Sequence, residues 1–332
     1  MSDPNDLHKR LEELNRAPLA KPPAEASDGE PLRDSVRKRL RTRRGGADKA
    51  PGPAAAKGAP QPIVFQRDVP RREPPARPVL RTNGPAIALG EALDGAEAAD
   101  ADGRCAYLLE RRLRRPDGPW CPLCDGLIDA AASHGSGLWA ELRRMEVTGA
   151  IGLGDVVFLD LETAGLGSSP AFLIGTMVWE AGGLVTRQYF ARDYSEERAA
   201  LGLFLQWAET RRLLVTFNGK SFDLPFVRTR AAANGLACPY APAHLDLLHV
   251  ARRAWGPELP DCRLQTLERV ICGRPRDDDI PGHLIPDAYH EYVRTGNAIR
   301  MVSVLEHNFL DLVTLADLLV RLPCGDSPAT NA

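Results

Sequence analysis

The sequence has 332 residues, enough for one large domain with extensions or for two smaller domains. Its 42 Lys and Arg residues nearly balance 44 Asp and Glu residues, so the net charge of -2 does not by itself indicate a nucleic-acid partner. No apolar run reaches the length of about 18 residues that a membrane span needs, and the polar N-terminus lacks a signal-peptide core. Seven scattered cysteines are typical of a reduced protein. We therefore expect a cytoplasmic protein without a membrane segment.

Residues 1–80 are predicted to form a disordered arm. From Ala24 to Pro78 the sequence is rich in Pro, Ala, Gly and Arg, and such a segment buries too little apolar surface to offset the entropy of ordering it. Residues 33–46, RDSVRKRLRTRRGG, are strongly basic. Flexible basic arms bind phosphate backbones without reading sequence. A solvated linker, whose charge only keeps the protein soluble, is the alternative interpretation.

Residues 81–150 are expected to form a small accessory element that leads into the main domain. Within it, Ala106–Arg114 fits a strand or a helix, and periodicity does not decide between them. Cys121 and Cys124 form a single CxxC pair, which could bind zinc together with Cys105 and His134. A second matched pair would be needed for a strong zinc prediction, and the sequence does not supply one.

Residues 151–322 are predicted to form an α/β domain, followed by a flexible tail at 323–332. Strands are expected at 156–163, on both sides of the Ala181-Gly182-Gly183 turn, and at 213–219. Helices are expected at 196–211, 223–235, 244–255, 262–273, 286–296 and 299–322. Three antiparallel strands, a helix, a fourth strand and then mostly helix predict a mixed central sheet flanked by helices.

Several carboxylates occupy positions where a cation site is expected. Asp160 and Glu162 are two apart on a predicted strand, so their side chains leave the same face and repel unless a cation lies between them. Asp223 follows the fourth strand at the start of a helix, where a negative charge is favourable. In the last helix, His307 and Asp311 are four apart and share a face.

Four carboxylates that converge from these elements would suit two divalent cations, Mg²⁺ or Mn²⁺, because both prefer hard oxygen ligands. Two such ions stabilise the attacking and the leaving oxygen in phosphodiester cleavage. His307 would accept a proton from the attacking water, since its ordinary pKa lies near neutrality.

Each residue also has a structural interpretation. A lone DxE pair occurs by chance, a helix-capping role would explain Asp223, and a hydrogen-bonded structural role would explain His307. Asp246 is expected to cap the helix that follows it, or to support the carboxylates from behind. Asp277, Asp278 and Asp279 are expected to be exposed acids in a loop. The joint order of the motifs favours a site at Asp160, Glu162, Asp223 and Asp311.

The motifs resemble the three exonuclease motifs of the DEDD 3′–5′ exonuclease superfamily, which includes the proofreading domain of family B DNA polymerases. VFLDLETAG resembles the first motif, FNGKSFDLPFVRTR the second and EHNFLDLVTLADLL the third. Residues 155–322 resemble more closely the bacterial YprB-type RNase H-like domain, through FNGKSFDLP, HLDLLH and a histidine-asparagine pair before the last aspartate. The resemblance covers about half of the chain and implies an RNase H-like fold.

The resemblance implies roles for individual residues. Asp160, Glu162, Asp223 and Asp311 would be the metal ligands, and His307 stands where polymerase-type relatives have a tyrosine base. Another subgroup has histidine five positions before the last aspartate, where this chain has Glu306. Asn218 and Phe222 fit positions of the second motif that line the site or only support the fold. The residues expected to contact substrate are Thr163, Asn218 and Phe222.

The expected function is therefore that of a metal-dependent 3′–5′ exonuclease acting on the single-stranded 3′ end of DNA or RNA. An RNase H-like endonuclease is the first alternative, because the carboxylates alone do not set polarity. The second is a nucleic-acid-binding protein that keeps the fold without catalysis.

If the basic arm binds phosphates by electrostatics, deleting residues 1–80 should weaken nucleic-acid binding far more at about 50 mM salt than at about 300 mM salt. Fluorescence anisotropy with a labelled oligonucleotide measures both affinities. An equal loss of affinity at the two salt concentrations would contradict an electrostatic role for the arm.

Overall fold

The computed structural model describes residues 86–113, 120–165, 167–276 and 279–324. All of them lie in one compact unit, Leu80–Ala332. The expected basic arm at 1–80 lies outside the described residues, and so does the expected tail from residue 325 onward. No helix in these ranges is both long and apolar enough to cross a membrane.

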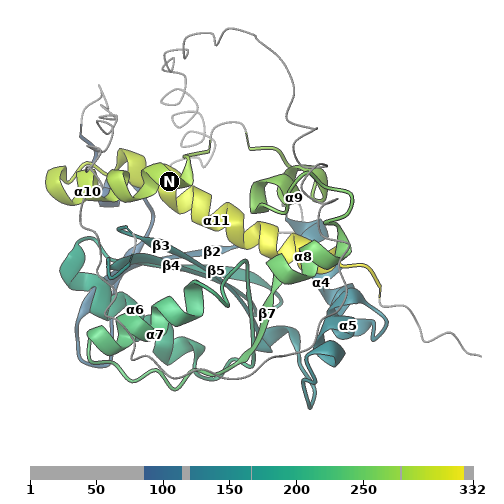
Figure 1. Cartoon of the computed structure of the whole chain (residues 1–332). Coiled ribbons are helices and arrows are strands. Elements are labelled where there is room, and N and C mark those ends of the chain that lie inside the picture. The colour runs from purple at the N-terminus through teal and green to yellow at the C-terminus, as the bar shows by residue number, and fades with distance from the viewer. Residues whose placement is uncertain (1–85, 114–119, 166, 277–278, 325–332) are drawn as a thin grey trace, which may run out of the picture. The chain divides into compact units, whose positions relative to one another are not determined.

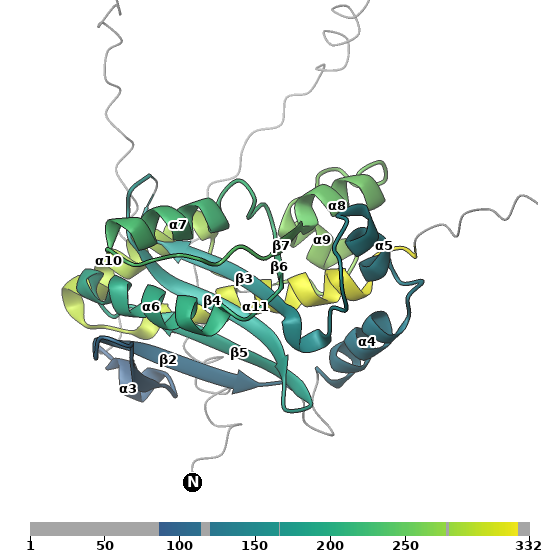
Figure 2. The same cartoon turned by 90° about the horizontal axis from the view of Figure 1, so that it is seen from below.

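One mixed sheet of seven strands organises this unit. The strands are β1 (Ala96–Ala99), β2 (Cys105–Arg112), β3 (Val156–Thr163), β4 (Ala171–Glu180), β5 (Gly183–Phe190), β6 (Leu213–Thr216) and β7 (Ala243–Asp246). Their order across the sheet is β1-β2-β5-β4-β3-β6-β7 (Figure 2). β3, β4 and β5 form an antiparallel meander, whereas β6 pairs in parallel with β3 and β7 in parallel with β6. The predicted mixed α/β fold is confirmed.

Helices cover both faces of the sheet. They are α3 (Leu89–Ala92), α4 (Cys121–Ala132), α5 (Gly137–Arg144), α6 (Glu197–Ala208), α7 (Asp223–Ala233), α8 (Leu247–Ala254), α9 (Leu264–Val270), α10 (Ile285–Thr295) and α11 (Ile299–Val320). The long helix α11 crosses one face and contacts β3 and β4, while α6 and α7 lie against the other face (Figure 1).

Side-chain alternation along the central strand β3 separates apolar core from polar site. Leu159 and Leu161 are buried in the core that includes α6 and α7. Phe158 packs on the opposite side, in the core formed with α11. Because successive strand residues point to opposite faces, Asp160 and Glu162 follow Phe158 onto the α11 side.

The turn between β4 and β5 confirms the predicted hairpin. Ala181 and Gly182 have φ values of 48° and 80°, so both lie in the left-handed region. Two such residues form the hairpin turn whose twist matches that of the flanking strands. Gly183 then begins β5, in register with Glu180.

The prediction that a helix begins at His244 is wrong. Ala243–Asp246 forms the edge strand β7, and α8 begins only at Leu247. A four-residue strand that runs directly into a buried helix leaves too few residues for periodicity to separate the two. Asp246 is the predicted cap, since its Oδ1 accepts from the backbone N–H of Leu248 at 3.1 Å.

The segment 81–150, expected as an accessory element, supplies strands to the same sheet. The ambiguous stretch after Cys105 is the strand β2, which pairs with β5. Strand β1 pairs with β2 and forms the edge of the sheet. The helices α4 and α5 contact α11 near its C-terminal end.

A buried ion pair anchors the start of β4. Glu197, the first residue of α6, accepts from the backbone N–H of Ala171 at 2.8 Å and from Arg230 Nη2 at 2.5 Å. Asn234 Nδ2 donates to the same carboxylate at 2.9 Å. The Glu197 side chain is 3% exposed, so its charge depends on these donors. The contacts join α6, α7 and the segment that follows β3.

Replacing Glu197 with alanine should lower the free energy of unfolding by about 3–5 kcal/mol, because Arg230 is left mostly buried without its partner. Urea unfolding of the full chain measures the change. Glu306→Ala is the control, since its pair with Arg111 is about half exposed and such pairs contribute about 1 kcal/mol or less. Equal losses in the two variants would contradict the role of Glu197.

Candidate active site

Carboxylates from three separate elements meet above the central strand. Asp160 and Glu162 come from β3, Asp223 begins α7 after the loop that follows β6, and Asp311 lies on α11. The parallel pairing of β6 with β3 brings the start of α7 beside the end of β3. The crossing of α11 over β3 supplies the fourth acid (Figure 1).

Burial and mutual repulsion dominate the electrostatics of this cluster. Burial raises the pKa of Asp160 well above its usual value, and the charges of Asp311, Glu162 and Asp223 raise it further. Burial likewise raises the pKa of Glu162 to about 8, although His307 opposes the shift. Carboxylates that lie close together in a site with little water repel one another in this way.

Asp223 has a similar environment. Burial raises the pKa of Asp223 to about 7, and the nearby charge of Asp246 adds to the shift. Asp246 is itself 2% exposed. Its two oxygens accept from the backbone N–H groups of Asn218 at 2.8 Å and Lys220 at 3.1 Å. Asp246 therefore holds the loop that leads to Asp223, in addition to capping α8.

His307 lies between two of the acids and a third partner. Its Nε2 is 3.5 Å from Asp311 Oδ2 and 4.0 Å from Glu162 Oε1. Its Nδ1 is hydrogen-bonded to the carboxylate of Asp279, 2.7 Å from Oδ1. Burial alone would lower the pKa of His307, but the hydrogen bond to Asp279 and the charges of Asp311 and Glu162 raise it above the usual value.

Asp279 corrects a prediction. It was expected to be an exposed loop acid, yet its side chain is 10% exposed and binds both His307 and Arg276. Hydrogen bonding to His307 and the charge of Arg276 lower its pKa, although burial opposes the change. The other two acids of the run, Asp277 and Asp278, lie outside the described residues.

Arg276 is a residue that sequence analysis missed. Its Nη2 lies 2.5 Å from Asp311 Oδ1, its Nε 2.5 Å from Glu268 Oε2, and its Nη1 3.1 Å from Asp279 Oδ2. The side chain is 7% exposed. The loop after α9 folds back onto α11, and the periodicity of the sequence does not predict this contact. The Arg276 guanidinium neutralises part of the negative charge of the acidic cluster.

The residues expected to contact substrate occupy different environments. The Thr163 hydroxyl donates to the carbonyl of Gly165 at 2.9 Å, which closes the turn after β3. Asn218 is exposed and has a left-handed φ of 64°. Phe222 is 37% exposed beside Asp223, and its ring stacks on Phe226 with centroids 5.3 Å apart. Phe222 thus lies at the surface next to Asp223, and Asn218 lies at the surface in the loop that leads to it.

The donor set fits hard divalent cations. The acids offer carboxylate oxygens, which are the preferred ligands of Mg²⁺ and Mn²⁺, and their repulsion would be relieved by positive charge. In the described part of the chain, no three His, Cys, Asp or Glu side chains are arranged to hold an ion as they stand. At Asp311, one oxygen already binds Arg276. The positive charge of Arg276 at Oδ1 would compete with a cation for Asp311.

The alternative zinc ligands are dispersed within the described ranges, where they form no such group. Cys105 begins β2, and Cys121 and Cys124 lie in the first turn of α4. The ring of His134 packs against Trp139, with centroids 4.5 Å apart.

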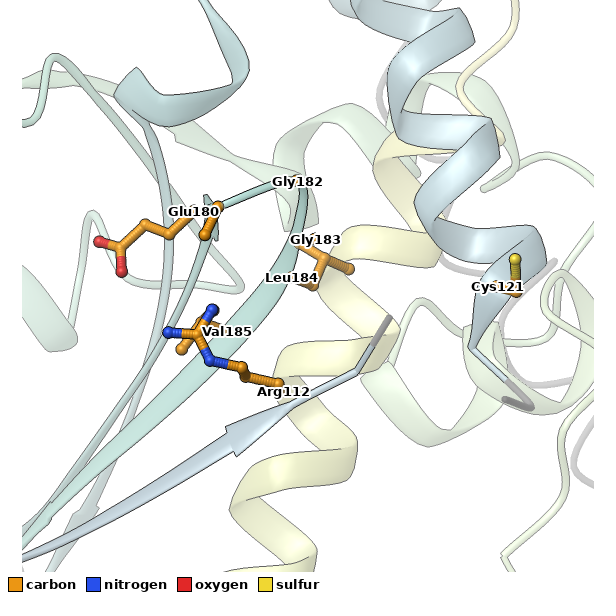
Figure 3. Close-up of a pocket in the computed structure, with 8 residues that line it drawn as sticks. Arg112, Cys121, Glu180, Gly182, Gly183, Leu184 and Val185 are labelled. Carbon is orange, nitrogen blue, oxygen red and sulfur yellow. The ribbon is translucent and has the colours of Figure 1, made fainter. Parts of the chain in front are cut away.

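A pocket of about 560 Å³ lies away from the acids. It is bordered by the β4–β5 turn, Arg112 at the end of β2 and Cys121 at the start of α4 (Figure 3). Its lining includes Glu180, five residues along β4 from Gly175, which pairs with Asp160. Five strand residues span roughly 17 Å. This pocket is not part of the acidic site.

In comparisons with known proteins, residues 157–323 match the family model described as the RNase_H superfamily. The chain is similar to the uncharacterized protein YprB of Bacillus subtilis (strain 168), with 32% identity over 173 residues. That match covers 51% of this chain and 42% of YprB, so it spans less than half of the relative. A family B DNA polymerase from the hyperthermophilic archaeon Pyrobaculum calidifontis matches with 17% identity and a TM-score of 0.41, over 49% of this chain and 24% of the polymerase.

The raised pKa values make stability depend on pH. Protons bound to Glu162 and Asp223 on folding stabilise the protein fully below about pH 4, and this contribution is lost as the pH rises through their folded pKa values of about 8 and 7. In EDTA, Glu162→Gln should therefore flatten the fall in stability between about pH 5 and about pH 8.

Urea unfolding in EDTA at several pH values measures this effect. Glu306→Gln on the same helix as Asp311 is the matched control, because Glu306 is exposed and should leave the profile unchanged. An unaltered profile in Glu162→Gln would show that Glu162 is ordinarily ionised in the folded protein.

Proposed function

This chain belongs to the RNase_H superfamily, and from that premise we propose that it is a metal-dependent nuclease that hydrolyses phosphodiester bonds as a 3′–5′ exonuclease. One observation carries the proposal. Asp160, Glu162, Asp223 and Asp311 come from three elements to one mostly buried site, where burial and mutual repulsion raise the pKa of Asp160. Such a cluster disfavours folding unless protons, hydrogen-bond donors or a bound cation compensate its charge, and clusters of this kind are typical of functional sites.

The four carboxylates would hold two divalent cations, Mg²⁺ or Mn²⁺, which would supply positive charge to the attacking and leaving oxygens of the phosphodiester. Asp160 and Glu162 provide two ligands from one strand, whose spacing fixes them on a common face. Asp223 and Asp311 provide the other two from α7 and α11.

His307 is proposed as the general base. Its Nε2 faces Glu162 and Asp311, and its Nδ1 is held by Asp279, so the ring presents one nitrogen to the site. The neutral imidazole accepts the proton of the attacking water at Nε2. The negative carboxylates favour the protonated form of His307. Bound cations would neutralise that negative charge, and His307 would then be neutral and able to accept a proton.

The surface around Asp223 is proposed to bind the nucleic acid. Phe222 offers an exposed aromatic face on which a base at a single-stranded 3′ end stacks. Asn218, exposed in the preceding loop, and Thr163, at the end of β3, would position the strand. The basic arm at 1–80 would raise the local concentration of DNA or RNA. The seven cysteines, which form no disulfide within the described residues, suit a reducing compartment, the cytoplasm.

Incubating the full chain with 5′-labelled single-stranded DNA or RNA tests the proposal. With Mg²⁺ or Mn²⁺ we expect a ladder that shortens from the 3′ end, and no cleavage in EDTA. Asp160→Ala should lower the rate by about a hundredfold or more, because it removes a ligand. Glu306→Ala, beside His307 but exposed, is the matched control and should retain the rate.

The outcomes separate the proposal from its alternatives. Internal cuts would replace exonuclease with endonuclease activity. Binding of the oligonucleotide without cleavage under either metal would contradict a nuclease and favour a nucleic-acid-binding protein. Cleavage that Asp160→Ala retains would place the activity elsewhere.

A further inference from the structure

Three residues form a row across the sheet beneath α11. Asp160 on β3 is in register with Gly175 on β4, and Gly175 is in register with Gln188 on β5. Asn308 on α11 reaches over the middle of this row and contacts both ends. Asn308 is fully buried and Gln188 is 4% exposed, so neither amide depends on water for its hydrogen bonds.

Gly175 leaves the space that Asn308 occupies. A Cβ atom at position 175 would lie 2.0 Å from Asn308 Oδ1 and 2.7 Å from its Nδ2. Glycine weakens a strand interior, and within a strand it often marks a close approach of another group. The close approach here is made by the side chain of Asn308.

The hydrogen bonds assign a direction to both amides. Gln188 Nε2 donates to the backbone carbonyl of Leu305 at 2.8 Å, and a carbonyl oxygen only accepts. The same Nε2 donates to Asn308 Oδ1 at 2.9 Å, so Asn308 presents its oxygen to Gln188. The Asn308 Nδ2 group is thereby directed at Asp160, where it donates to Oδ2 at 2.8 Å and to the backbone carbonyl at 3.2 Å.

We propose that Gln188 and Asn308 form an amide relay that orients Asp160 for cation binding, an inference that rests on the proposed function of Asp160 as a ligand. The relay engages Oδ2 and leaves Oδ1 of Asp160 for a cation. The Asn308 amide offers Asp160 a hydrogen-bond donor, which stabilises the ionised form of the Asp160 carboxylate. A cation binds this ionised form. Asn308 and Gln188 are thus positioning residues, and Gly175 gives them room.

Isothermal titration of the metal-free full chain with Mn²⁺ tests the relay without measuring catalysis. The paired replacement Gln188→Met with Asn308→Leu keeps side-chain volume and removes both amides together, which leaves no unmatched buried polar partner between them. Gly175→Ala displaces Asn308 while removing no polar group. Loss of a group that orients a metal ligand typically weakens metal affinity about 10- to 100-fold. We expect that loss in both variants.

Thr176→Val is the matched control. Thr176 is the buried neighbour of Gly175 on β4, faces the other side of the sheet and donates to the carbonyl of Arg187 at 3.2 Å. It should alter the melting temperature without altering Mn²⁺ affinity. The paired variant should show the reverse, with weaker Mn²⁺ binding and a metal-free melting temperature close to that of the wild type.

Unchanged Mn²⁺ affinity in the folded paired variant would overturn the relay, and that variant decides the matter if Gly175→Ala does not fold. A wild type that binds no Mn²⁺ would overturn both the relay and the metal-dependent function. A wild type that binds Mn²⁺ but cleaves no oligonucleotide would overturn the nuclease proposal alone, provided the paired variant binds Mn²⁺ more weakly.

Discussion

Repulsion among mostly buried carboxylates is the constraint on which the rest of this structure depends. Asp160 and Glu162 leave the central strand on the same face, and Asp311 approaches them from the helix above. In a site with little water, such charges are tolerated only when protonation, hydrogen bonds or cations compensate them. The surrounding elements supply hydrogen-bond donors and positive charge that offset this repulsion.

Each compensating group is anchored to a different part of the fold. Arg276 reaches Asp311 from the loop after α9, and His307 is held toward the acids by Asp279. The Asn308 amide reaches Asp160 through a gap that Gly175 leaves in β4. The guanidinium of Arg276 carries a positive charge at Asp311 Oδ1, so it would compete with a metal ion for this carboxylate. We therefore expect Arg276 to move away from Asp311 when metal ions bind at the site.

Local patterns in the sequence predicted the elements that carry the acids. The two-residue spacing of Asp160 and Glu162 on a predicted strand placed both side chains on one strand face. The four-residue spacing of His307 and Asp311 placed this pair on one face of the last helix. These relations lie within single elements, where periodicity fixes side-chain direction.

Contacts between distant elements were beyond the reach of periodicity. Asp279 and His307 are 28 positions apart, and Arg276 and Asp311 are 35 apart, so a charged loop looked like solvated surface. The sequence analysis did not predict the strand β7, because this strand has four residues and is followed directly by a helix. The strands β1 and β2 precede the recognisable motifs, and their place in the sheet depends on pairing with β5, far along the chain.

Anomalous X-ray diffraction from crystals grown with Mn²⁺ tests the central claim most directly, because it locates the cations independently of any activity. We predict Mn²⁺ peaks among Asp160, Glu162, Asp223 and Asp311, with Arg276 displaced from Asp311. Crystals in which Mn²⁺ is absent from this cluster, while Arg276 still binds Asp311, would contradict the account.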